Sequence, residues 1–366
     1  MSFALWVFTI SAALIAYGYL IYPLLALLLA RLFPRPVRRG EITPSATVLI
    51  PALNEERVIG EKIENTLALD YPRDRVEILV ISDGSTDRTA GIARRYADRG
   101  VTVIEFAERR GKLKALLDVV PRARGELLVF SDASGMLRPD ALRAMAANFA
   151  DPAVGGVCGY YRSPGLEREG RAGELLYWDY EFAIKRAQSR WATLMGATGA
   201  MYALRRELFV SPPPDTINDD FVIPALMVSR GHRMVLEEGA VVDDHDPHMG
   251  NFRSRVRVTA GNWQQLFVCR GLLSLRRPRV CWQFLSHKAI RLVMPLLLLS
   301  LGASMLALAP GWGLAALAAA ALCTLPWKTG PGKKISSAAR KFFSGNAAAL
   351  YGTAIYFTRR GRLTWN

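Results

Sequence analysis

The stretch Val80–Thr89 reads Val-Ile-Ser-Asp-Gly-Ser-Thr-Asp-Arg-Thr. An apolar run ends at Ile81, polar turn residues follow at once, and a helical pattern begins after them. This order is typical of a buried strand that ends in a turn and leads into a helix. Ligands bind at the carboxyl ends of strands in open α/β sheets, so Asp83 is expected at a binding site, with helix capping as the alternative role of Asp83 and Asp87.

Strand and helix patterns alternate on both sides of this stretch. Strands separated by helices predict right-handed crossovers and therefore an α/β fold with a mixed, mostly parallel sheet. The strongest strand patterns are 46–50, 76–81, 101–105 and 126–131, with weaker ones at 154–160, 200–204 and 234–242. The predicted intervening helices are 54–69, 86–99 and 111–120.

Two common classes of nucleotide-binding enzyme are disfavoured. No GxGxxG follows the first predicted strand, which argues against a dehydrogenase, and the chain has no GxxxxGK[ST] of a P-loop enzyme. The four cysteines are scattered and contain no CxxC pair, so free thiols in a reducing compartment are expected. The net charge of +15 suits anionic lipids and phosphate-bearing substrates, or reflects basic flanks of membrane segments. No arrangement of the basic residues calls for nucleic acid.

Both ends of the chain contain long apolar segments. Residues 3–30 carry no charged side chain, which predicts a membrane-spanning helix rather than a cleaved signal peptide. The apolar runs 292–309 and 312–327 predict a helical hairpin with a turn at Pro310. The run 345–357 is short for a span and is expected to lie in the membrane interface, with a fourth span as the alternative. Basic residues after these segments predict a multi-pass protein of the inner (cytoplasmic) membrane whose catalytic domain is cytoplasmic.

These segments divide the chain into four parts. A transmembrane helix is expected at 1–31, a cytoplasmic α/β domain at 45–285, a transmembrane hairpin at 286–328, and a basic segment with a short helix at 329–366.

The polar motifs at the predicted strand ends follow one another in a specific order. This order resembles that of the family 2 inverting glycosyltransferases, which have the GT-A fold, and the resemblance covers roughly 45–285. The flanking helices resemble the membrane-embedded branch of that family: the chitin, hyaluronan, cellulose and poly-N-acetylglucosamine synthases and ceramide glucosyltransferase. The motifs are Pro51-Ala52-Leu53-Asn54-Glu55, Asp83-Gly84-Ser85-Thr86-Asp87, Gly111-Lys112, Asp132-Ala133-Ser134 and Asp219-Asp220.

The resemblance implies a binding site for a UDP-sugar donor. Pro51 and Glu55 occupy the positions that hold the nucleoside in the family, and Asp83 matches the carboxylate that contacts the uracil base. Lys112 begins a predicted helix, where an ammonium and the helix N-terminus suit a diphosphate. The alternative for Lys112 is a solvated lysine within a basic run.

The resemblance also implies a divalent cation, Mg²⁺ or Mn²⁺, at the Asp132-Ala133-Ser134 motif. Such hard cations prefer oxygen ligands. Ser134 replaces the second aspartate of the family's DxD pattern and offers only a neutral oxygen, so Asp132 is expected to supply most of the metal affinity. A turn aspartate at a strand end is the alternative for Asp132.

Asp219 and Asp220 match the family's Glu-Asp pair, of which the second member is the general base. An inverting displacement needs one base on the face opposite the leaving group. Acidic residues in the first turn of a helix are the structural alternative for this pair.

A motif near 254–264 is expected to contact the acceptor. The processive synthases carry Gln-x-x-Arg-Trp before their membrane helices; Arg257 fits the arginine and suits the diphosphate, while Val258 replaces the tryptophan. Trp263 and Gln264 are candidate acceptor contacts. Nearby, His245 and His248 are expected in a polar loop above the active site, with a zinc site as the alternative.

The expected function is a membrane-bound inverting glycosyltransferase that moves one sugar from a UDP-sugar to a hydroxyl of a lipid-linked, glycan or other membrane-proximal acceptor. Membrane lipids are the other expected partners. Two alternatives stay open: a processive polysaccharide synthase of the same fold, and a non-catalytic membrane scaffold or sensor subunit.

Overall fold

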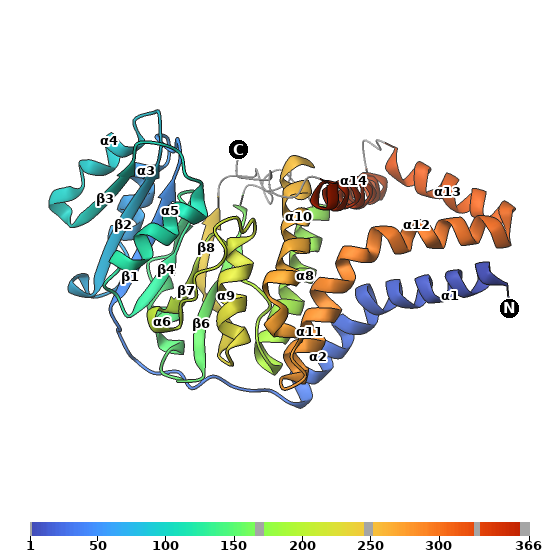
Figure 1. The fold of residues 1–366 in the computed structure, drawn as a ribbon, viewed down its shortest axis with the longest axis horizontal. Coiled ribbons are helices and arrows are strands. Elements are labelled where there is room, and N and C mark those ends of the chain that lie inside the picture. The colour runs from blue at the N-terminus through green and yellow to red at the C-terminus, as the bar shows by residue number, and fades with distance from the viewer. Residues whose placement is uncertain (1, 165–171, 245–251, 326–329, 359–366) are drawn as a thin grey trace.

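The computed structural model describes residues 2–164, 172–244, 252–325 and 330–358 (Figure 1). An α/β domain lies at one end of the molecule, and apolar helices extend from it at the other (Figure 1). His245 and His248, predicted to lie in a polar loop, fall outside the described residues.

The α/β domain is built on one eight-stranded sheet of order β3-β2-β1-β4-β7-β6-β8-β5. Strands β1 to β4 are parallel to their neighbours among themselves and β6 is parallel to β8, whereas β7 is antiparallel to both β4 and β6 and β5 is antiparallel to β8. The sheet is therefore mixed and mostly parallel, as the sequence predicts. The strands are β1 (Ala46–Ala52), β2 (Val76–Asp83), β3 (Val101–Phe106), β4 (Leu127–Phe130), β5 (Gly135–Leu137), β6 (Val154–Arg162), β7 (Tyr202–Arg205) and β8 (Arg233–Asp244).

Helices cover both faces of the sheet. The central strands alternate their apolar side chains between two cores: Val48 and Ile50 of β1 point into one core and Leu49 into the other. The first core includes side chains of α3 (Ile59–Leu67), α4 (Thr89–Arg94), α6 (Ala141–Asn148) and α8 (Ala172–Trp191). The second includes side chains of α5 (Lys112–Val119) and α9 (Asp219–Ser229).

Helices α3 and α4 begin later than the patterns 54–69 and 86–99 indicate. Polar side chains in the two preceding turns hydrogen-bond each other's backbone: Asn54 Oδ1 accepts Thr86 N–H at 2.8 Å, and Asp87 Oδ2 accepts Glu56 N–H at 3.1 Å. Asp87 Oδ1 also accepts Thr89 N–H at 2.9 Å, so Asp87, one residue before the N-cap Arg88, satisfies the first backbone N–H of α4. These bonds satisfy backbone groups that a longer helix would otherwise have used.

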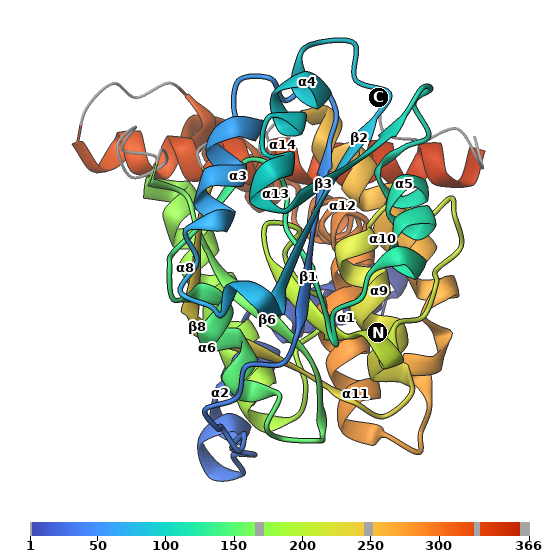
Figure 2. The same cartoon turned by 90° about the vertical axis from the view of Figure 1, so that its left-hand side faces the viewer.

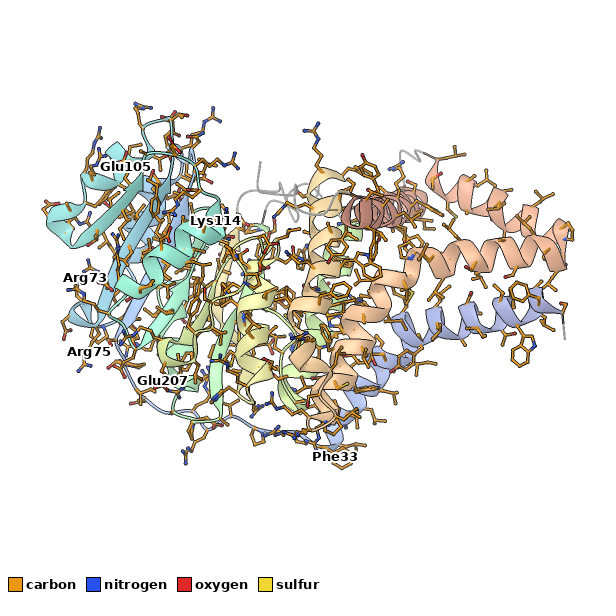
Figure 3. The ribbon with its side chains drawn as sticks, viewed as in Figure 1. Phe33, Arg73, Arg75, Glu105, Lys114 and Glu207 are labelled. Atoms are coloured by element: carbon orange, nitrogen blue, oxygen red, sulfur yellow. The ribbon has the colours of Figure 1, made fainter. Side chains whose placement is uncertain are left out.

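Two long helical segments carry mostly apolar side chains. Helix α1 (Phe3–Ala16) continues through a π-helical turn into α2 (Tyr22–Leu32), and α11 (Pro278–Gln283) continues through a second π-helical turn into α12 (Ile290–Leu308). Both segments are long and apolar enough to cross a membrane. Their exposed side chains are largely hydrocarbon (Figure 3), which suits association with a membrane. The large exposed ones include Phe3, Trp6, Ile10, Leu20, Leu24, Leu28, Leu296 and Leu299.

The two long segments pack against each other close to their π-helical turns, Tyr17–Ile21 and Phe284–Ala289. A Cβ atom added to Gly18 would lie only 2.2 Å from the terminal carbon of Met294, so glycine permits this close approach. The segment α1–α2 is also tied to the α/β domain, because Gln188 of α8 hydrogen-bonds the Tyr22 hydroxyl at 2.6 Å.

The C-terminal helices complete the apolar end. The chain reverses at Ala309, and α13 (Pro310–Thr324) runs back from the far end of α12 (Figure 1). Helix α14 (Gly330–Thr358) is seen end-on in Figure 1 and lengthwise in Figure 2, so it runs across the direction of α1 and α12. The apolar run 345–357 is thus the second half of a longer helix, whose first half is rich in lysine, serine and alanine.

Candidate active site

Asp83 fixes the loop that leads into α5. It ends β2, is 3% exposed, and its two carboxylate oxygens accept the N–H groups of Arg110 at 2.7 Å and Gly111 at 2.8 Å. Gly111 has a φ of 92°, a conformation that favours glycine, and Lys112 follows as the first residue of α5. Asp83 therefore positions Lys112 through the backbone, and its predicted contact with the nucleoside stays a prediction.

Pro51 and Glu55 lie beside Asp83 at the same sheet edge. Pro51 is in β1 opposite Ile81 of β2. On its other side, β1 pairs with β4 only as far as Leu49, which lies opposite Phe130. Pro51 lies beyond that pairing, where a residue without a backbone N–H is tolerated. Glu55 follows in the turn, where its N–H donates to Thr89 Oγ1 at 2.8 Å.

Lys112 lies among three carboxylates that come from two different segments. Its Nζ is 2.6 Å from Asp132 Oδ1, just after β4, and 3.7 Å from Asp219 Oδ2 at the start of α9. Burial lowers the pKa of the Lys112 ammonium, but Asp132, Asp219 and Asp220 outweigh burial and raise it well above its ordinary value. The fold thus brings together the predicted diphosphate, metal and base residues.

Asp219 and Asp220 form the first turn of α9, and helix α10 (Phe252–Val268) holds this turn in place. The side-chain amide of Asn218 donates to Val258 O at 3.1 Å and to Asn262 Oδ1 at 3.0 Å. The approach is close, because a Cβ atom added to Gly261 would lie 2.5 Å from the Asn218 side chain.

The carboxyl group of Asp220 has an environment that suits a general base. Burial, followed by the neighbouring charges of Asp219 and Asp132, raises its pKa to about 6, while Lys112 and Lys185 oppose that rise. A base whose pKa lies close to the working pH combines the ionised form with useful proton affinity.

The pH dependence of activity tests this environment. The kcat/KM of the wild-type chain is expected to rise with pH through an apparent pKa near 6, because only the ionised Asp220 accepts a proton. A pH series of initial rates at low substrate concentration measures it. A kcat/KM that stays constant from about pH 5 to about pH 8 would contradict a base with this pKa.

Arg257 reaches the site from α10. Burial lowers the pKa of its guanidinium, and the charges of Asp219 and Asp220 oppose this, which places Arg257 within electrostatic reach of both carboxylates. Val258, which follows it, is 41% exposed, so this position offers no aromatic platform. Arg257 is thus brought to the site as the sequence predicts, and its contact with a diphosphate stays a prediction.

Trp263 and Gln264 are engaged in other contacts. Trp263 Nε1 donates to Thr353 Oγ1 at 2.9 Å, so its ring lies against α14. Gln264 Oε1 accepts Ile217 N–H at 2.8 Å, and its amide donates to Asp215 O at 3.0 Å. Gln264 therefore supports the loop that precedes the base, and the acceptor contacts of both residues stay predictions.

Lys62 is a site residue that sequence analysis missed. It is fully buried under the Asp132 turn, where its Nζ donates to Ser131 Oγ at 2.7 Å and to the carbonyl oxygen of Gly135. Burial lowers its pKa to about 7, against the opposing effect of Asp132 and Asp244. The sequence signal was a lysine on the inward stripe of a helix, beside the buried Ile63.

The carboxylates fit a divalent cation that shares its ligands with a diphosphate. Within the described ranges, no three His, Cys, Asp or Glu side chains form a cage for a metal ion. Mg²⁺ is commonly held by one or two carboxylates together with substrate phosphates. Asp132, with 36% of its side chain exposed, meets that requirement, and Ser134 lies two residues later in the same turn.

Known proteins resemble this chain in part of its sequence and in its fold. The model of the family described as "Glycosyl transferase family 2" matches residues 47–210. An N-acetylglucosaminyltransferase of Azorhizobium caulinodans is 28% identical over 218 residues, which is 55% of this chain and 54% of that protein. A beta-monoglucosyldiacylglycerol synthase of Synechocystis is 33% identical over 118 residues, which is 31% of this chain and 25% of that protein. This chain thus spans about half the length of the first relative and a quarter of the second.

One solved structure is similar along nearly the whole chain. It is the mannosyltransferase PcManGT from Pyrobaculum calidifontis in complex with GDP-Man and Mn²⁺. The match has a TM-score of 0.74 and 24% identity, and it covers 97% of this chain and 99% of that one. The likeness shows that the two chains share a fold, apolar helices included.

Proposed function

We propose that this chain, whose residues 47–210 match the model of the family 2 glycosyltransferases and which has the GT-A fold, transfers one sugar from a UDP-sugar to an acceptor hydroxyl with inversion at the anomeric carbon. The acceptor is lipid-linked, or a glycan close to the membrane. The observation that carries this proposal is the meeting of Lys112 with Asp132 and with the pair Asp219 and Asp220.

In the proposed reaction Asp220 removes the proton from the acceptor hydroxyl. The hydroxyl oxygen then forms a bond to the anomeric carbon on the face opposite the diphosphate, and the bond from that carbon to the diphosphate oxygen breaks. Lys112 and Arg257 stabilise the negative charge of the departing UDP. Asp132, with Ser134 nearby, would hold Mg²⁺ or Mn²⁺, which would supply further positive charge at the diphosphate.

We further propose that the chain is a multi-pass protein of the inner membrane with its catalytic domain in the cytoplasm. Basic residues follow the first apolar segment and favour the cytoplasmic side for the domain. Helix α13 has 15 residues and is about 22 Å long, short of a straight span of about 30 Å. Helix α14 crosses the direction of the long helices and suits the membrane interface (Figure 2).

A single transfer is favoured over processive synthesis. The tryptophan position of the processive motif holds the exposed Val258, and Trp263 faces α14 instead. The relative from Synechocystis is named for a glycolipid product, which supports a lipid acceptor.

A donor screen tests the proposed function. The purified full chain in detergent, with Mn²⁺ or Mg²⁺ and a membrane lipid extract, is incubated with a panel of UDP- and GDP-sugars, and nucleotide release is measured. Metal-dependent release of UDP from one sugar is expected. Release of GDP alone would show that the donor is a GDP-sugar and not a UDP-sugar. No release of nucleotide from any donor by folded protein would favour the non-catalytic scaffold.

Ser134→Asp tests the metal motif separately. A second carboxylate two residues after Asp132 adds a charged ligand to the cation site. We expect the Mn²⁺ concentration for half-maximal activity to fall by about tenfold, because affinity rises with the charge of the ligand set. An unchanged or higher Mn²⁺ requirement would contradict a cation at this turn.

A further inference from the structure

Two further lysines lie within electrostatic reach of Asp220. Lys185 lies on α8, and Lys288 lies in the π-helical turn Phe284–Ala289 that leads into α12. Both interact electrostatically with Asp220 and with each other. Lys112 begins α5 and Asp132 follows β4, whereas Lys185 comes from α8 and Lys288 from the turn that leads into the apolar helix α12.

Neither lysine has a carboxylate partner among the described residues. No described Asp or Glu oxygen lies within 4.0 Å of either ammonium, and the contact each one makes is with an aromatic ring. Lys185 Nζ lies 5.3 Å from the centre of the Phe182 ring, and Lys288 Nζ lies 5.4 Å from that of Phe221. Lys185 is only 5% exposed, so its charge is largely removed from water.

The nearby cation of α12, Arg291, differs from the two lysines because it has a carboxylate partner, Glu181. Arg291 lies 2.7 Å from Glu181 Oε2, and His287 Nε2 lies 3.2 Å from Glu181 Oε1. Both oxygens of Glu181, the remaining carboxylate within electrostatic reach of Lys288, are therefore already engaged. Asp220 does not serve as a close partner either, because it lies beyond ion-pair distance and has to exchange a proton during the reaction.

Two neighbouring ammonium groups, one of them buried, are unfavourable without an anion. A phosphate matches them best, because its several oxygens accept hydrogen bonds from two separate point charges at once. The position adds a constraint, since Lys288 lies on the segment Pro278–Leu308, which is apolar enough to cross a membrane. A ligand here would place its phosphate on the lysines, its hydroxyl at Asp220 and its hydrocarbon along α12.

We propose that Lys185 and Lys288 form the binding site for a phosphate in the acceptor, so that the acceptor is a phosphate-bearing lipid rather than a neutral one. This inference rests on the proposed function, because it names the acceptor class of the same site. It assigns no role in the chemical step to the two lysines, which hold the acceptor while Asp220 takes the proton.

The acceptor class is tested by transfer to fractionated lipids. A membrane lipid extract is separated on an anion exchanger into neutral and anionic fractions, and transfer of labelled sugar by the full chain is measured with each. Label is expected in the anionic fraction. Mild acid then distinguishes the sources of the phosphate, because it cleaves polyprenyl-phosphate linkages and leaves glycerophospholipids intact. Label confined to the neutral fraction would overturn the proposal.

Variants test the two lysines directly. Lys185→Met and Lys288→Met are each expected to raise the KM for the anionic acceptor by about tenfold or more, the effect of losing one charge-assisted hydrogen bond. Lys185→Arg keeps the charge and is expected to recover most of the affinity. Lys114→Met is the control, because Lys114 is exposed on α5 (Figure 3). An acceptor KM that is the same in both Met variants as in the control would overturn the assignment.

Lipid binding without donor separates this inference from the proposed function. Native mass spectrometry of the detergent-solubilised chain counts bound molecules from the anionic fraction, and the Lys185→Met/Lys288→Met double variant is expected to retain fewer. If the wild type binds such lipids through the two lysines but turns over no nucleotide sugar, the phosphate site stands and the transferase proposal fails. If the double variant binds them as the wild type does, the site fails.

Discussion

Asp220→Asn is expected to lower kcat for sugar transfer by about 10²–10⁴-fold, the usual contribution of a general base. Asparagine keeps the shape of the side chain but cannot accept the proton of the acceptor hydroxyl. The affinity for UDP is expected to change little, because Lys112 and Asp132 keep their contact at 2.6 Å. Steady-state kinetics together with calorimetric titration of UDP measure both quantities.

Asp215→Asn is the matched control for this variant. Asp215 is exposed in the loop that leads to the base, and the hydrogen bond that it accepts from Gln264 is made by its backbone oxygen. The control is therefore expected to keep wild-type kcat. If Asp220→Asn transferred sugar as fast as the control, the base would have to be another residue.

Asp132→Asn is expected to lower kcat/KM for metal-dependent turnover by about 10³-fold or more. The reason is the loss of the carboxylate charge that holds the cation at the diphosphate. The same change removes the shortest ion pair of Lys112. Binding of Mn²⁺, followed by its electron paramagnetic resonance signal in the presence of UDP, is expected to weaken in parallel with activity.

Asp140→Asn supplies the comparison for the metal variant. Asp140 is exposed at the start of α6, a few residues after the Asp132 turn, and has no place in the proposed site. It is expected to bind Mn²⁺ and turn over donor as the wild type does. Retention of Mn²⁺ binding by Asp132→Asn at the wild-type level would remove Asp132 from the proposed metal site.

The strand ends of the site were predictable because each combines a local pattern with a general rule. Asp83 and Asp132 each follow an apolar run after a single serine, and the carboxyl ends of parallel strands meet at one edge of a sheet. Their proximity therefore follows from the sequence once the strands are placed. The pairing of Lys112 with Asp132 and Asp219 did not follow, because it depends on how α5 and α9 pack on the same face of the sheet.

Other parts of the site depend on contacts between segments far apart in the chain. The burial of Lys62 is set by the turn at Ser131 and Gly135, about 70 residues later in the chain. The position of the two acceptor-side lysines depends on α8 meeting the turn before α12, about 100 residues away, as the contact between Gln188 and His287 illustrates. A local sequence pattern does not predict contacts between residues so far apart in the chain.

Element boundaries were missed where side chains bond the backbone. The 54–69 helix was predicted from its apolar spacing, but Asn54 and Glu56 bond the neighbouring turn and delay the helix to Ile59. The helix predicted at 345–357 is too short, because only its apolar run was used to place it. The helix α14 begins at Gly330 and includes the polar residues before that run.

The stereochemistry and size of the product test the central claim most directly. Product made by the wild-type chain from an α-linked UDP-sugar is purified, and its anomeric configuration and mass are determined by nuclear magnetic resonance and mass spectrometry. The account predicts one added sugar in a β linkage, with no product from Asp220→Asn. An α-linked sugar would contradict the single displacement assigned to Asp220, and a long polymer would contradict a single transfer.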